Sequence, residues 1–125
     1  MNMQRRPRPP GVKPAAYKEF EEKTRDRSPE EYDEINHDFM ELFREFGELK
    51  AQNCSSDSTE VQGQVQKLRD FITEHFYNCT PEILEELGKM YAGGGAFTET
   101  IDGRGGKGTA DFTSQAINIY AGNQA

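Results

Sequence analysis

The 125-residue sequence has no tryptophan and only two cysteines, Cys54 and Cys79. Two cysteines cannot form the disulfide framework of a small secreted domain, so we expect both thiols to be reduced. No apolar run approaches the roughly 20 residues that cross a bilayer, and the N-terminus lacks the charged-then-apolar pattern of a secretory signal. These absences predict a cytoplasmic protein that does not bind membranes.

Motifs for metal or nucleotide binding are also missing. His37 and His75 are the only histidines, and neither stands at a spacing typical of zinc ligands. Residues 103–108 match the GxGxxG pattern formally. Nucleotide binding would require a preceding strand and a βαβ unit, which the sequence does not predict, so we interpret these residues as a helix connection. We therefore expect no metal site and no cofactor.

The sequence offers one pair of residues that could carry enzyme chemistry. Cys79 lies four residues after His75, a spacing that could place a thiol nucleophile beside a base. A nearby helix N-terminus would lower the pKa of that thiol. No third orienting group accompanies the pair, so we expect no catalytic residue and no enzyme activity.

Charge is distributed unevenly along the chain. Residues 1–14 contain four of the six prolines and four cations, Arg5, Arg6, Arg8 and Lys13. Proline removes backbone donors and fixes φ, which predicts a disordered basic arm over residues 1–14. Since the whole chain carries −7 and this arm carries +4, residues 15–125 carry −11. Such an acidic body repels phosphate backbones, so we expect no direct nucleic-acid binding by this domain.

Helical signals in residues 15–125 predict an all-α fold of about five helices. The clearest helix begins at Ser28, whose side chain can act as the N-cap, and Pro29 and Glu31 complete the helix start and a capping box. The apolar residues that follow recur at the spacing of one helix face: Ile35, Phe39, Leu42, Phe43, Phe46 and Leu49. No segment alternates with the two-residue period of a strand.

Weaker signals place the remaining helices. The predicted segments are residues 15–25, 57–76, 80–91 and 109–120, with a brief helical turn over residues 97–102. Asp57 and Glu60 can form a capping box at the start of the second segment, and Thr80 and Thr109 are the expected N-caps of the two that follow.

The aromatic content exceeds what a small core requires. Large rings stand at Tyr17, Tyr32, Phe39, Phe43, Phe76, Tyr77, Tyr91, Phe97 and Tyr120. These rings could fill a solid core, or they could line a concave pocket for a bulky, ring-rich ligand, where tyrosine offers both a flat face and a hydroxyl.

Several ordered runs of residues resemble a known family. The runs are Phe76-Tyr77-Asn78-Cys79-Thr80-Pro81-Glu82, Leu87-Gly88-Lys89-Met90-Tyr91, Phe97-Thr98 with Ile101-Asp102, and Gly108-Thr109-Ala110-Asp111-Phe112. They are similar to the TipAS antibiotic-recognition domain, the C-terminal effector domain of MerR-family TipA-like transcriptional regulators. The resemblance covers about residues 16–121. It implies a globin-like helical fold with a cleft that binds thiopeptide-like or other multi-ring antibiotics.

The resemblance also implies how the chain acts and which residues contact its ligand. Without the DNA-binding helix-turn-helix and coiled coil of full-length members, the chain resembles a stand-alone drug-sequestering or sensor domain. It could also associate with a MerR-type regulator. The ligand-binding residues that we expect are Tyr32, Phe39, Leu68, Arg69, Tyr77, Cys79, Tyr91 and Phe97.

Three departures from the family pattern leave an alternative open. Glu86 stands where some members carry a drug-capturing cysteine, and Leu68 stands where a histidine is common. Residues 93–95 are three glycines in place of the usual turn after Tyr91. The alternative is a protein-interaction module of a regulator that has lost drug binding.

Overall fold

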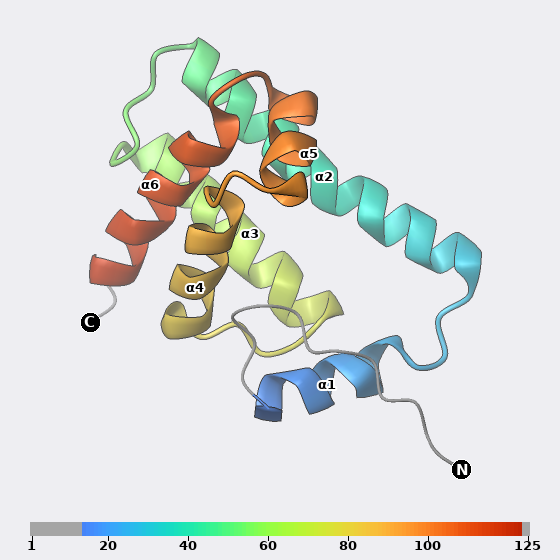
Figure 1. Cartoon of the computed structure of the whole chain (residues 1–125). Coiled ribbons are helices and arrows are strands. Elements are labelled where there is room, and N and C mark those ends of the chain that lie inside the picture. Colours follow the sequence, from blue (N-terminus) through green and yellow to red (C-terminus); the bar gives the residue numbers. More distant parts are fainter. Residues whose placement is uncertain (1–13, 124–125) are drawn as a thin grey trace.

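The computed structural model describes residues 14–123, with side chains from residue 18 onwards, and this part of the chain is entirely helical (Figure 1). Its helices are α1 (Pro14–Thr24), α2 (Pro29–Ala51), α3 (Thr59–His75), α4 (Pro81–Tyr91), α5 (Ala96–Gly105) and α6 (Thr109–Asn123). The all-α prediction is confirmed, whereas the globin-like arrangement stays a prediction. The predicted arm lies outside the described residues except for Pro14, the first residue of α1.

The turn expected over residues 97–102 is a complete helix, α5. The glycines around it lower its intrinsic helix propensity, which made the sequence signal weak. Tertiary packing supplies the missing stability, because Ile101 is completely buried in the core. The about five helices and the brief turn that were predicted correspond to the six helices of the described residues.

Two of the expected helix caps form as predicted. The Ser28 hydroxyl accepts from the Glu31 amide at 3.1 Å, and the Glu31 carboxylate accepts from the Ser28 amide at 2.8 Å. Thr80 caps α4 in the same way, its hydroxyl accepting from the Ile83 amide at 3.2 Å. These caps depend on residues three positions apart, and local sequence is therefore sufficient to find them.

The other two caps differ from the prediction. Ser58, not Asp57, is the N-cap of α3. Thr109 is the first residue of α6, and its hydroxyl donates to the Gly106 carbonyl at 2.7 Å. The Asp102 carboxylate instead accepts from the Ala110 amide at 2.9 Å. The end of α5 thus caps α6, a contact between residues too far apart for a local capping signal.

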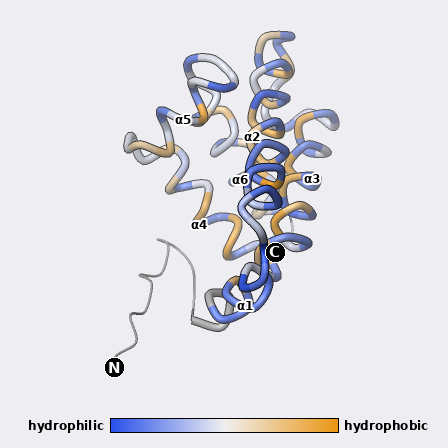
Figure 2. The backbone as a smooth tube through the Cα atoms, turned by 90° about the vertical axis from the view of Figure 1, so that its right-hand side faces the viewer, coloured by the Kyte–Doolittle hydropathy of each residue, from blue (hydrophilic) through white to orange (hydrophobic). Residues whose placement is uncertain are grey.

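One core unites α2 to α6. Hydrophobic and hydrophilic residues alternate along these helices (Figure 2), as a single buried face on each requires. Only the second half of α2 is buried, at Met40, Leu42, Phe43, Phe46 and Gly47. The first half projects from the body, and α1 lies across one end of the molecule, beside the end of α3 (Figure 1). None of the described helices is long and apolar enough to span a membrane.

The backbones of α2 and α5 touch where two glycines meet. A Cβ added at Gly47 would lie 2.1 Å from the Gly105 carbonyl oxygen and 2.6 Å from its Cα. A Cβ added at Gly105 would lie 2.7 Å from the Phe43 carbonyl oxygen. Both helices must therefore lack a side chain at this crossing.

We expect Gly47→Ala to lower the free energy of unfolding by about 1–3 kcal/mol or more, because the added methyl forces α5 away from α2. Gly63→Ala is the matched control, since a Cβ there meets nothing within 4 Å. It should raise the stability by about 0.5–1 kcal/mol through helix propensity. Urea denaturation of both variants measures the difference, and equal effects would contradict the close contact.

Candidate functional site

An apolar pocket of about 140 Å³ lies where five helices converge. Its walls are formed by Phe20 of α1, Phe39 of α2, Ile72 of α3, Phe76 and Tyr77 of the connection to α4, Leu87, Met90 and Tyr91 of α4, and Phe97 of α5. Of the predicted ligand-binding residues, the structure brings four together here: Phe39, Tyr77, Tyr91 and Phe97. A cavity of roughly 150 Å³ can hold one benzene-sized ring, so this pocket has room for a single ring system.

Ring-to-ring contacts hold the walls of this pocket in place. The centroids of Phe39 and Phe76 are 5.5 Å apart in an edge-to-face arrangement, and those of Tyr91 and Phe97 are 5.1 Å apart. Behind the wall, Phe43 packs edge-on against Tyr91 at 5.2 Å. Phe39, Phe76 and Phe97 are each only half-buried, which makes them the rim through which a ligand can enter.

Two of the residues that line the pocket, Tyr77 and Tyr91, carry a hydroxyl group. Burial raises the pKa of both Tyr77 and Tyr91 above the ordinary value, and for Tyr91 the neighbouring Tyr77 and Cys79 contribute in the same direction. Both hydroxyls are therefore neutral at physiological pH. Among the described residues neither hydroxyl has a hydrogen-bond partner, so each keeps an unused donor.

Three of the other predicted site residues lie away from the pocket. Tyr32, 38% exposed, stands on the projecting half of α2, about 10 Å before Phe39 along the helix axis. Leu68 is completely buried in the core. The Arg69 guanidinium donates to the Cys79 carbonyl at 2.7 Å and to the Tyr120 hydroxyl at 2.9 Å. Arg69 thus joins α3, the turn before α4 and α6.

Cys79 is also outside the pocket lining, and its thiol is fully buried. Burial raises the pKa of Cys79 to about 12, although the charge of Arg69 acts in the opposite direction. The expectation that a helix N-terminus lowers this pKa was wrong, because burial disfavours the charged thiolate. His75 does not contact the thiol; its ring packs on Phe71, with 4.4 Å between centroids.

Five pocket residues were not predicted as site residues: Phe20, Ile72, Phe76, Leu87 and Met90. Helical periodicity identifies only which face of a helix is directed inward. An inward face can meet either a neighbouring side chain or an open space, and periodicity does not distinguish the two cases. The missing signal was the convergence of five helices, which only the fold provides.

Two cations anchor α1 beside the pocket. The Lys23 ammonium donates to the carbonyl oxygens of Thr73 and Glu74 at 2.9 and 3.3 Å, and the Arg27 guanidinium donates to that of His75. These carbonyls form the C-terminus of α3, the negative end of its dipole, where cations are favourable. The two cations hold α1 so that Phe20, on the same helix, lines the pocket.

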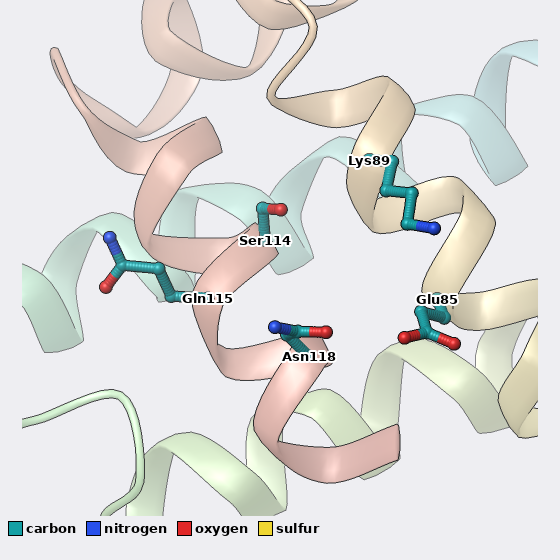
Figure 3. A pocket seen from close by; sticks show the side chains of 5 residues that line it. All are labelled: Glu85, Lys89, Ser114, Gln115 and Asn118. Atoms are coloured by element: carbon teal, nitrogen blue, oxygen red, sulfur yellow. The ribbon is translucent and has the colours of Figure 1, made fainter. Parts of the chain in front are cut away.

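A second pocket is polar and lies between α4 and α6, with a volume of about 190 Å³. Its walls are Glu85 and Lys89 of α4 and Ser114, Gln115 and Asn118 of α6 (Figure 3). The two pockets share no residue, and only the second is lined entirely by polar or charged residues. Among the described residues, no group of three or more His, Cys, Asp or Glu side chains is placed to hold a metal ion.

The chain matches known proteins over most of its length. The family described as the TipAS antibiotic-recognition domain matches residues 11–120. The HTH-type transcriptional activator Mta of Bacillus subtilis is 31% identical over 106 residues, which cover 85% of this chain and 40% of the relative. The HTH-type transcriptional activator TipA of Streptomyces coelicolor is 31% identical over 87 residues, which cover 70% of this chain and 34% of the relative.

A solved structure extends this similarity to three dimensions. It is TipAS from Streptomyces lividans in complex with nosiheptide, from a study of a thiopeptide antibiotic multidrug resistance system. The TM-score is 0.78 at 29% sequence identity, and the match covers 88% of this chain and 76% of the other. The chain spans less than half the length of the two transcriptional activators.

Removing both cations with Lys23→Met and Arg27→Met should release α1 from α3. Hydrogen bonds to charged groups contribute about 1.5–3 kcal/mol each, so we expect amides of α1 to exchange with deuterium at least about tenfold faster. Exchange in α3 and α6 should not change. Lys18→Met, an exposed position on the same helix, is the control, and exchange no faster than in that control would rule out the anchor.

The buried Cys79 thiol should resist alkylation. At about pH 8 only roughly one thiol in ten thousand is ionised when the pKa is about 12, and the thiolate is the reactive form. With Cys54→Ser leaving Cys79 as the single thiol, iodoacetamide should leave the mass of the folded protein unchanged. The same treatment in denaturant should add one adduct. Rapid modification of the folded variant would contradict the burial of this thiol.

Proposed function

The chain belongs to the TipAS antibiotic-recognition domain family, and on that premise we propose that its apolar pocket binds a thiopeptide-like or other multi-ring antibiotic. One observation carries the proposal. Phe39, Tyr77, Tyr91 and Phe97, from three helices and a connecting turn, converge on a space that the core leaves open. A structural relative with a TM-score of 0.78 is a complex with the thiopeptide nosiheptide.

The size of the pocket suggests how a large ligand binds. About 140 Å³ accommodates one ring, so the other rings of a multi-ring compound lie along the half-buried rim formed by Phe39, Phe76 and Phe97. Flat heterocycles stack on such rings with little loss of side-chain freedom. In this proposal the unpaired hydroxyls of Tyr77 and Tyr91 are the donors for ring nitrogens or carbonyl oxygens of the ligand.

Binding is reversible and does not involve catalysis in this proposal. Glu86, an exposed residue of α4, stands where the resemblance places a drug-capturing cysteine in some members, and the thiol of Cys79 is buried and protonated. Covalent capture therefore has no accessible nucleophile at either position. The remaining chemistry is apolar stacking and hydrogen bonding, which suits a drug-sequestering or sensor domain.

The cellular setting is part of the same proposal. The two activators that resemble this chain extend well beyond the matched region. We infer a cytoplasmic domain that either holds the drug by itself or associates with a MerR-type regulator.

The alternative is an interaction module that has lost drug binding. In that case the rim formed by Phe39, Phe76 and Phe97 would contact a partner protein. Binding of a regulator that Phe39→Ala does not alter would favour an interface elsewhere.

Nosiheptide should stabilise the chain against thermal unfolding in proportion to ligand concentration. Phe97→Ala should weaken binding at least about tenfold, because a buried phenylalanine contributes about 1.5–3 kcal/mol. Phe112→Ala on α6 is the matched control: Phe112 is half-buried against the core but does not line the pocket. Calorimetric titration of the three proteins provides the affinities.

Two results would defeat this proposal. One is the absence of any stabilisation at saturating nosiheptide and other thiopeptides. The other is an equal loss of affinity in Phe97→Ala and Phe112→Ala, which would show that general loosening of the core, not the pocket wall, controls binding.

A further inference from the structure

The polar pocket between α4 and α6 has opposite charges at its two ends. Lys89 and Ser114 stand across from each other at one end, and Glu85 and Asn118 at the other (Figure 3). Gln115 points away from the space between the helices (Figure 3). One end therefore offers an ammonium and a hydroxyl, and the other offers a carboxylate and a side-chain amide.

Most of these polar groups have no partner. Glu and Lys four residues apart on a helix commonly pair, but the Lys89 ammonium lies 3.6 Å from Glu86 instead. Among the described residues, Glu85, Ser114 and Asn118 make no side-chain hydrogen bond or ion pair. The exposed Lys89–Glu86 contact is weak at this distance and exposure, so a ligand can compete for Lys89.

The core fixes the distance between the two walls. Gly88 and Ile117 are both buried where α4 meets α6, and a Cβ added at Gly88 would lie 3.0 Å from Ile117 Cγ2. The two helices cannot approach further or slide without disturbing this contact. The backbones of the two polar rows are consequently held at a constant spacing, and a ligand has to order only the side chains, chiefly that of the exposed Lys89.

We propose that this pocket binds the zwitterionic head of a small free α-amino acid. The ligand carboxylate pairs with Lys89 and Ser114, and the ligand ammonium pairs with Glu85 and Asn118. A lone anion would meet the carboxylate of Glu85, and a lone cation would meet Lys89, so only a molecule with both charges gains from both ends. The volume of about 190 Å³ fits glycine or alanine better than a large side chain.

This site is independent of the proposed antibiotic site. Its residues lie on a different face of α4 from Leu87 and Tyr91, and no pocket residue is shared. Failure of amino-acid binding would therefore leave the apolar pocket untouched. Failure of nosiheptide binding would likewise say nothing against amino-acid binding in the polar pocket.

The test is an NMR titration of the isotope-labelled chain with glycine, and with acetate and methylammonium as single-charge probes. Glycine should shift the amide signals of Ser114 and Asn118 saturably. Each single-charge probe should bind at least about tenfold more weakly, since it loses one charged hydrogen bond. No saturable shift with glycine, or acetate binding as tightly as glycine, would overturn the proposal.

Three substitutions on α4 sharpen the test. Glu85→Gln should weaken glycine binding at least about tenfold by removing the partner of the ammonium. Glu86→Gln should strengthen it, because Lys89 loses its competing ion pair. Glu82→Gln is the control, an exposed acid on the same helix outside the pocket. A Glu85→Gln variant that is folded by circular dichroism and binds glycine as the control does would refute the assignment.

Discussion

The glycine crossing of α2 and α5 positions much of what lies around the apolar pocket. With Gly47 and Gly105 in backbone contact, α5 lies close enough to α2 for Phe97 to reach Tyr91 and for Ile101 to enter the core. The same placement brings Asp102 to the first turn of α6, where it caps the Ala110 amide. A side chain at either glycine would disturb one wall of the pocket and the start of α6 together.

The apolar pocket exists because α1 covers the core only at one end. An 11-residue helix is marginal in water without tertiary contacts, and α1 depends on Phe20, Lys23 and Arg27 for its attachment to α3 and the turn that follows. Two of these contacts are hydrogen bonds between cations and carbonyls, each of which contributes only about 1.5–3 kcal/mol. The body from α2 to α6 is held by buried apolar contacts instead. The covering wall is therefore the part that can adjust to a ligand larger than one ring.

Local sequence signals predicted the features that depend on neighbouring residues. Ser28 and Thr80 satisfy amides three residues away, so their caps could be identified from spacing alone. Asp102 caps an amide eight residues away across a turn in which Gly106 and Gly108 adopt positive φ. No periodicity indicates such a contact. For the same reason the weakly signalled α5 looked like a single turn.

The predicted site residues fall into two groups, those that line the apolar pocket and those that make contacts within the core. Phe39, Tyr77, Tyr91 and Phe97 were predicted as ligand-binding rings, the last three within the family motifs, and the structure places all four on one pocket. Leu68 and Arg69 belong to α3, whose inward face also forms part of the core. Leu68 packs in that core, and Arg69 donates a hydrogen bond to the Tyr120 hydroxyl. A sequence pattern gives the direction of a side chain on its own helix. It does not reveal whether that side chain meets another part of the protein or an open space. This difference decides between a core contact and a ligand contact.

The burial of Cys79 has a consequence for the kind of recognition that this domain can perform. A thiol that stays protonated and has no exposed surface cannot add to an electrophilic ligand, and the carboxylate of Glu86 is a poor substitute for a thiolate. In the proposed antibiotic complex, affinity comes from apolar area and from hydrogen bonds, both of which act without a covalent bond being made. A complex formed in this way dissociates when the free drug concentration falls. Such reversibility favours a sensor of antibiotic level, while sequestration would require the domain to be abundant relative to the drug.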